Sequence, residues 1–112
     1  MKPLLTNDLN SFLSRFDNFE GSEFRNLEII SPTSFKVTLA TQDRARGYDW
    51  LTIDFEFTNI SSANLLDDSK LKYIDLSAGI AISNNGTEFA FKILDSTFFI
   101  ECSSIKYQEG AF

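Results

Sequence analysis

The stretch from Tyr48 to Phe57, YDWLTIDFEF, alternates between apolar and polar side chains, and this alternation decides the expected fold. Successive side chains of a β-strand point to opposite faces of the sheet. One face of this strand carries Leu51, Ile53, Phe55 and Phe57, and the other carries Trp50, Thr52, Asp54 and Glu56. The first set predicts a face buried in the core, whereas the second leaves the one tryptophan of the sequence beside two carboxylates on an outward face.

The same two-residue period recurs along most of the chain. Strand-like stretches rich in phenylalanine and β-branched residues cover about 24–31, 34–43, 48–59, 71–83, 87–94 and 97–107. Short turn-like links such as Asp43–Gly47 and Asn84-Asn85-Gly86 favour antiparallel pairing. The link at 59–70 is too long for a hairpin, so we expect it to cross an edge of the sheet or to form a short helical turn.

A different period precedes the strands. Phe12, Leu13, Phe16 and Phe19 recur at the spacing of one helical face, after a cap-like Thr6-Asn7-Asp8 and before Gly21. These residues predict an amphipathic helix over 7–19. The expected fold is therefore α+β, with this N-terminal helix packed on a curled, mostly antiparallel sheet of about six strands.

The expected core lies between the helix and the inner face of the sheet. Phe12, Leu13 and Phe16 would cover an inner face made of Leu27, Ile29, Val37, Leu39, Ile53, Phe55, Phe57, Phe89, Phe91 and Ile93. One helix covers only part of so long a sheet, so we expect strong curling, with bulges at Gly79 and at Ser103-Ser104, where the in–out alternation slips.

Length and composition indicate a single domain over residues 1–112. Hydrophobic residues make up 43% of the sequence, and twelve phenylalanines allow a core that needs neither disulfides nor a metal. The one cysteine, Cys102, has no intramolecular partner, and the N-terminal MKPLLTNDLN lacks the apolar run of a secretory signal. No stretch approaches the roughly 20 apolar residues of a membrane helix. These features predict a cytoplasmic protein.

Charge and residue types exclude several classes of function. Ten basic against sixteen acidic residues give a net charge of −6, which argues against binding to nucleic acid or to anionic membranes. The sequence has no histidine, so the commonest general base, the usual nucleophile–histidine arrangements and the usual zinc ligands are missing. The five glycines stand singly, without a phosphate-binding loop. We therefore expect no enzyme activity, cofactor or metal, and we expect Cys102 to be a buried structural thiol.

Two groups of residues remain as candidate sites. Asp54 and Glu56 share one face of a strand about 6.5 to 7 Å apart, a spacing that suits acid–base chemistry or a hard cation but also an ordinary solvent face. Arg44, Arg46, Tyr48 and Trp50 gather around one turn. Arginine, tyrosine and tryptophan are the residues most enriched at the energetic centres of protein interfaces. This turn is the better-motivated site, although solvated arginines and a tryptophan at the sheet margin would explain the same pattern.

The order of segments resembles that of small bacterial immunity proteins from toxin–immunity systems, including contact-dependent inhibition. The resemblance is carried by NFEGSE leading into LEIIS, then FKVTLATQD, WLTIDFEF, IDLSAGIAI and a closing FFIECSSIKYQEG. Glu20-Gly21 stands where such proteins often have a His-Asp pair. The resemblance implies a cytosolic protein that binds a cognate toxin and blocks it by occlusion, with a basic nuclease as one candidate partner.

Three hypotheses follow from the sequence. In the first, a toxin binds through anchors and an acidic field made of Arg44, Arg46, Tyr48, Trp50, Asp54, Glu56, Asp75 and Glu101. In the second, the chain is an accessory or homo-oligomeric domain, such as a homodimer, whose uncovered sheet face meets another subunit. In the third, Asp54 and Glu56 form a catalytic pair in a curled sheet.

Overall fold

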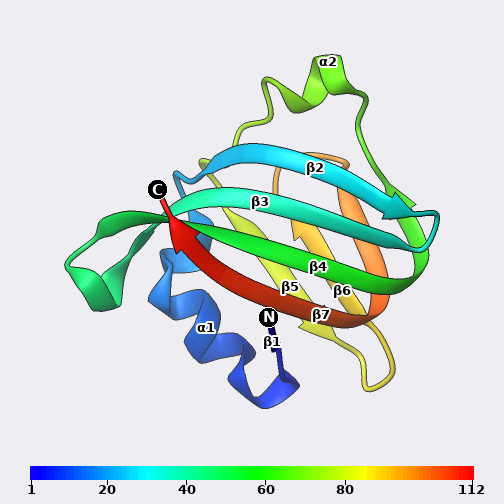
Figure 1. Ribbon diagram of the computed structural model, residues 1–112, viewed down its shortest axis with the longest axis horizontal. Coiled ribbons are helices and arrows are strands. Elements are labelled where there is room, and N and C mark those ends of the chain that lie inside the picture. The colour runs from blue at the N-terminus through cyan, green and yellow to red at the C-terminus, as the bar shows by residue number, and fades with distance from the viewer.

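The computed structural model describes residues 1–112, apart from the side chain of Asp68. The elements follow the chain as β1 (Lys2–Pro3), η1 (Thr6–Asp8), α1 (Leu9–Arg15), η2 (Asp17–Phe19), β2 (Glu23–Ser31), β3 (Ser34–Asp43), η3 (Arg44–Arg46), β4 (Asp49–Asn64), α2 (Asp68–Leu71), β5 (Ile80–Asn84), β6 (Phe89–Ile93) and β7 (Phe99–Ala111). One short helical segment near the N-terminus and a large sheet confirm the α+β class (Figure 1).

The strands form one antiparallel sheet in the order β2-β3-β4-β7-β6-β5. β7 is the central element, because it pairs with β4 along one edge and with β6 and then β1 along the other. Strands β2 and β5 are the two edges, so the sheet is open.

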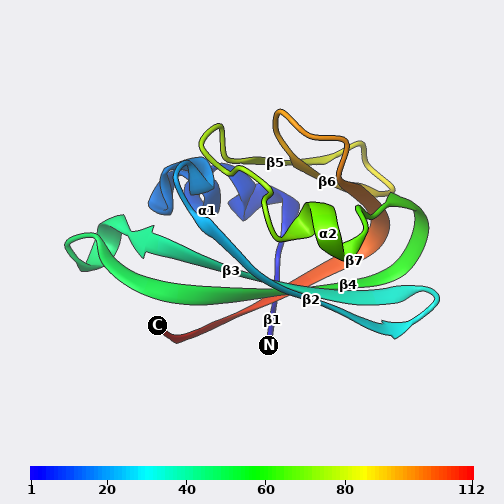
Figure 2. The same cartoon turned by 90° about the horizontal axis from the view of Figure 1, so that it is seen from above.

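The sheet folds back over its own inner face. In Figure 2, β2, β3 and β4 form one layer with the C-terminal part of β7, while β5, β6 and α1 lie over the inner face of that layer. The core fills the space between the two layers, and the outer face of the β2-β3-β4-β7 layer carries no helix. A sheet of this length can therefore cover its own apolar face together with a short helix.

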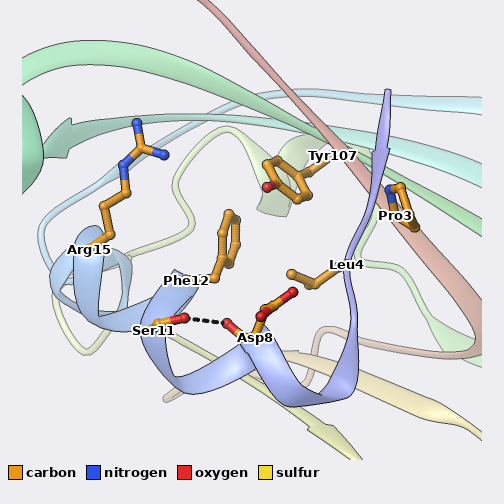
Figure 3. Close-up of a pocket in the computed structure, with 7 residues that line it drawn as sticks. All are labelled: Pro3, Leu4, Asp8, Ser11, Phe12, Arg15 and Tyr107. Carbon is orange, nitrogen blue, oxygen red and sulfur yellow. Dashed lines mark hydrogen bonds between the residues drawn. The ribbon is translucent and has the colours of Figure 1, made fainter.

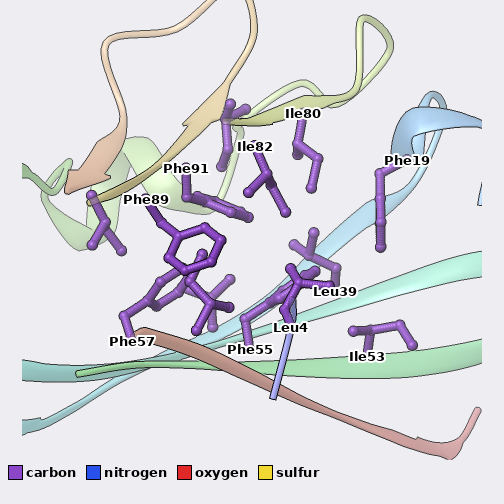
Figure 4. Packing of buried hydrophobic residues seen from close by; sticks show 14 of the residues in the cluster. Leu4, Phe19, Leu39, Ile53, Phe55, Phe57, Ile80, Ile82, Phe89 and Phe91 are labelled. Atoms are coloured by element: carbon purple, nitrogen blue, oxygen red, sulfur yellow. The ribbon is translucent and has the colours of Figure 1, made fainter. Parts of the chain in front are cut away.

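The register predicted for β4 is confirmed. Leu51, Ile53, Phe55 and Phe57 are buried, and the last three are fully inaccessible. Phe55 lies at the centre of the aromatic core, where its ring contacts those of Phe12, Phe19, Phe57 and Phe91. Figure 4 shows Phe55 among the buried residues of both layers.

The predicted helix over 7–19 is too long. The α-helix covers Leu9–Arg15 and is flanked by the 3₁₀ turns η1 and η2. Asp17, Asn18 and Phe19 have positive φ values of 51°, 56° and 60°, which cannot continue a right-handed helix. This break turns the Phe19 side chain into the core, where it is fully buried.

Two further predictions about strands and faces are wrong. The strand predicted at 71–83 is confined to Ile80–Asn84, because the preceding residues form the end of α2 and a loop. Ile29 is 62% exposed, and Leu27 is only partly buried. Both lie on β2, one of the two edge strands, where the layer formed by β5, β6 and α1 ends. The other predicted core residues of the sheet are buried.

The bulges do not lie at the predicted residues. Gly79 precedes β5 and belongs to no strand pair. The in–out alternation does slip at Ser103-Ser104, between the buried Cys102 and Ile105. The pairing register, however, shifts at Phe24–Asn26 and Ile29–Ser31 of β2 and, in the β4–β7 pair, between Ile60 and Ser62 of β4. An extra residue on β4 bends the sheet at this point.

Within the residues that the structure describes, no helix has the length and apolar character needed to cross a membrane.

Candidate functional site

The predicted turn with its aromatic and basic residues is a hairpin between β3 and β4. Its tip is the 3₁₀ turn Arg44–Arg46, which begins where the Asp43 carboxylate accepts a hydrogen bond from the Ala45 N–H at 2.9 Å. Gly47 ends the turn with a φ of 64°, and Tyr48 follows at 67°. Arg44, Arg46 and Tyr48 are therefore presented on a short, well-defined projection, and all three are exposed.

Trp50 belongs to an exposed aromatic cluster at the hairpin end of the outer sheet face. Its ring lies 5.4 Å from that of Phe112, and the Arg25 guanidinium lies 4.8 Å from the centre of the Phe112 ring. Trp50 is 37% exposed and Phe112 65% exposed. We call Arg25, Trp50 and Phe112 the outer aromatic cluster. Sequence reasoning missed Arg25 and Phe112, although the β4–β7 register, with Leu51 opposite Ala111, brings Phe112 beside Trp50.

Asp54 and Glu56 lie on the same outward face, further along β4. The Thr38 hydroxyl donates a hydrogen bond of 2.6 Å to the Asp54 carboxylate. Glu56 stands opposite Lys36 of β3 and Lys106 of β7. Two lysines thus flank Glu56 from the neighbouring strands, which makes the middle of the face a mixed-charge surface.

The remaining two predicted residues lie away from the hairpin. Asp75 is in the loop between α2 and β5, where its carboxylate accepts bonds from the N–H and hydroxyl of Ser77 at 2.8 and 3.0 Å. Glu101 is in the first part of β7, opposite Ala90 of β6. Phe112 follows the other end of that strand. The structure therefore brings together the hairpin residues and Trp50, and leaves Asp75 and Glu101 apart from them.

Behind the hairpin lies a four-residue ionic network that sequence reasoning missed. Arg15 of α1 donates to both carboxylate oxygens of Asp43, at 2.9 and 2.6 Å, and to Glu109 of β7 at 2.5 Å. Arg46 approaches the same two carboxylates at 3.3 and 3.6 Å. We call Arg15, Asp43, Arg46 and Glu109 the hairpin network, and its two positive and two negative charges balance.

The hairpin network fixes the base of the hairpin. The Asp43 side chain is fully buried, and the hydrogen bonds from Arg15 hold its pKa below the ordinary value for a carboxyl group. The same contact with Asp43 raises the pKa of Arg15. A buried carboxylate needs such partners, so the network ties α1, the hairpin and the end of β7 to one another.

A cavity of about 330 Å³ opens beside this network, between α1, β1 and β7 (Figure 3). We call it the α1–β7 cavity, and its lining residues are Pro3, Leu4, Asp8, Ser11, Phe12, Arg15 and Tyr107. Ser11 and Arg15 also line a second hollow, with Ser14, Arg44 and Ala45. Ser11 and Arg15 therefore lie between the cavity and a hollow beside the hairpin.

Within the residues that the structure describes, which leave out the Asp68 side chain, no three histidine, cysteine, aspartate or glutamate residues are grouped so that they could hold a metal ion.

Cys102 is fully buried, and desolvation raises the pKa of its thiol to about 11. We expect the native protein to react with a disulfide-exchange reagent such as Ellman's reagent only as fast as Cys102 becomes exposed by opening of the fold. In denaturing urea, one thiol per chain should react at once. Rapid, complete reaction of the native protein would show that Cys102 is accessible.

No family model matches the sequence, and comparison with curated proteins and with solved structures also finds no match.

Proposed function

We propose that this chain is a binding protein that engages a partner protein through the hairpin and the outer aromatic cluster. The observation that carries the proposal is the exposed contact of Phe112 with Arg25 and Trp50, at the end of the sheet from which the hairpin residues Arg44 and Tyr48 project. Tryptophan, tyrosine and arginine combine a large apolar area with directed polar groups, and such residues dominate binding energy at interfaces. Arg25 and Trp50 lie on paired strands, so little backbone freedom is lost there on binding.

In its most specific form, the proposal is that the partner is a cognate bacterial toxin and that the chain is its immunity protein. The resemblance described above supports this identification, and the net charge of −6 is compatible with it. An acidic inhibitor is attracted to a basic surface, such as the substrate-binding patch of a nuclease, and this attraction speeds association. Neutralisation would then occur by occlusion, with the hairpin end covering the toxin and no covalent bond changed.

The test is capture of the partner from the native cell, followed by co-expression. A captured protein that stops growth when it is expressed alone should become harmless when this chain is expressed with it. If the stable partners that are captured are all harmless when expressed alone, the immunity function is wrong even though the binding function stands.

A second candidate function is self-association through the outer sheet face. The observation in its favour is that this face carries no helix or second layer (Figure 2). Sedimentation equilibrium distinguishes the two functions. A stable dimer that the Trp50→Ala substitution dissociates would favour self-association, whereas a monomer across micromolar concentrations would leave the surface available to a different protein.

We expect Trp50→Ala to weaken binding to the partner by about 10- to 100-fold, because it removes the ring that supports Phe112 and contributes to the binding surface. Isothermal titration calorimetry with the captured partner measures this change. The matched control is Tyr73→Ala, which removes an aromatic side chain that is 84% exposed in the loop after α2. Equal losses from the two substitutions would show that the outer aromatic cluster is not the binding surface.

A further inference from the structure

We propose that the partner protein adds an extended strand to β7 along Glu109–Ala111, an assignment that rests on the proposed function. We call these residues the β7 edge. They lie beyond the part of β7 that β1 covers, on the side away from β4. Main-chain groups at the edge of a sheet form hydrogen bonds with an incoming strand, which then becomes part of the sheet.

β1 covers only a short part of β7. The pair nearest to the C-terminal end of β7 joins Lys2 to Tyr107, whereas β7 runs on to Ala111. In Figure 1, β1 meets β7 partway along its length. On the other side, β4 pairs with β7 as far as Ala111. The last residues of β7 therefore have a paired strand on one side only.

The direction of the main-chain groups follows from the bonds to β1. The Leu4 N–H donates to the Ile105 carbonyl at 2.8 Å, so the main chain of Ile105 points toward β1. Successive residues of an antiparallel strand direct their N–H and C=O groups to opposite neighbours. Glu109 and Ala111 follow Ile105 at even steps and therefore also point away from β4. Among the described residues, no main-chain group of a turn or loop bonds to either of them.

The position beside the β7 edge is open. Gly110 and Ala111 are exposed. A hollow of about 340 Å³ lies at the start of the edge, lined by Met1, Lys2, Tyr107, Gln108 and Glu109. Lys2 and Glu109 bring opposite charges to this hollow, so charge alone does not define its ligand. The specific feature is the row of main-chain groups, which an extended strand matches.

The two outermost strands of the sheet are less suited to this role. β2 has shifts in pairing register at Phe24–Asn26 and Ile29–Ser31, and such bulges twist an edge away from an incoming strand. β5 lies in the other layer, away from the outer face. The β7 edge, in contrast, leads directly into Phe112 of the outer aromatic cluster. A partner that contacts this cluster has the β7 edge beside it.

A second copy of the chain fits the β7 edge less well than a strand of another protein. A two-fold antiparallel pair that satisfied both free residues would place Glu109 of one copy opposite Ala111 of the other. Phe112 would then lie opposite Gln108, where Met1 already lines the hollow. A strand of the partner protein can instead pair with the β7 edge in line with β1 and leave the sheet before it reaches Met1.

The β7 edge can be tested first on the full chain alone. An N-terminal extension of sequence Thr-Val-Thr-Val-Thr would lengthen β1 along the edge, whereas Gly-Ser-Gly-Ser-Gly of the same length has little tendency to form a strand. We expect the first extension to slow amide hydrogen exchange of Glu109 and Ala111 at least about tenfold relative to the second. The amides of Gln108 and Gly110, which point toward β4, are internal controls and should not change.

The captured partner supplies the second measurement. Its binding to the unextended chain should slow exchange of the same two amides by at least about tenfold. Ala111→Pro should weaken binding by at least about tenfold, because it removes an N–H from the edge and places a ring there. This N–H points away from β4, so the variant should keep the wild-type midpoint of urea unfolding. The Thr-Val extension should also weaken binding relative to the Gly-Ser extension, because it occupies the edge.

Three results would overturn the proposal. The first is equal exchange of Glu109 and Ala111 with the two extensions. The second is a partner whose binding depends on Trp50 but leaves both amides exchanging as in the free chain, and this result would leave the proposed function standing. The third is protection of both amides by raising the concentration of the chain alone, which would assign the edge to a second copy.

The opposite separation is also measurable. A captured partner that protects both amides but is harmless when expressed alone would support strand addition and contradict only the immunity function.

Discussion

Gly79→Ala is expected to lower the free energy of unfolding by about 3 to 5 kcal/mol, since it combines a left-handed backbone with severe crowding. Gly79 has a φ of 79°, and a Cβ there would lie 2.2 Å from the backbone oxygen of Asn18. The backbone cannot shift freely, because the Gly79 N–H donates to Leu76 at 2.9 Å and its carbonyl accepts from Leu94 at 3.1 Å. The turn at η2, which positions Phe19 in the core, would have to move instead.

The matched control is Gly47→Ala. Gly47 has a similar φ of 64°, but a Cβ there would meet no atom within 4 Å. We expect a loss of only about 1 to 2 kcal/mol, the conformational cost alone. Urea unfolding of both variants measures the difference. Equal losses would show that the close approach between Gly79 and Asn18 does not constrain the fold.

The second large effect is expected for Arg15→Met, at about 2 to 4 kcal/mol of unfolding free energy. Breaking a buried ion pair usually costs about 3 to 5 kcal/mol, because it leaves a carboxylate buried without its main partner. We lower that figure because the Arg15 side chain is 30% exposed and Arg46 remains 3.3 Å from Asp43. Arg25→Met, which breaks an exposed pair with Glu23, should cost less than about 1 kcal/mol.

The cost of Arg15→Met should also depend on pH. The pKa of Asp43 is lowered in the folded protein, so the folded state binds fewer protons and the network contributes fully above the unfolded pKa, about 3.9. This contribution is lost as the pH falls below that value through the folded pKa. We therefore expect the stability difference between wild type and Arg15→Met to be larger at pH 7 than at pH 3. A difference that is the same at both values would mean that the Asp43 charge does not contribute to it.

Local patterns were enough to predict the central strands. In β4, four apolar side chains alternate with polar ones. On a helix this two-residue period would spread the apolar side chains around the whole circumference, whereas on a strand it places them on one face. The hairpin at Asp43–Gly47 was equally predictable, because turn-forming residues there separate two strand-like runs. The burial of side chains on edge strands is harder to predict. Ile29 fits the inner-face pattern, but its exposure depends on where the covering layer ends, which is a property of the whole fold.

The candidate site was only partly predictable, because its parts meet through tertiary contacts. Arg15 and Asp43 are separated by 28 residues, and Arg15 and Glu109 by 94. No local pattern indicates that these residues share one network. Phe112 could have been placed beside Trp50 only from the pairing of β4 with β7. Residues that lie on one strand or one turn were predicted together, whereas those joined across the sheet were not.

The most direct test of the proposed function is the growth of cells that express the captured toxin together with variants of this chain. We expect wild type and Tyr73→Ala to protect the cells fully. The double variant Trp50→Ala/Phe112→Ala should fail to protect, although circular dichroism should show that it is folded, because neither side chain belongs to the buried core. Full protection by the folded double variant would contradict binding through the outer aromatic cluster.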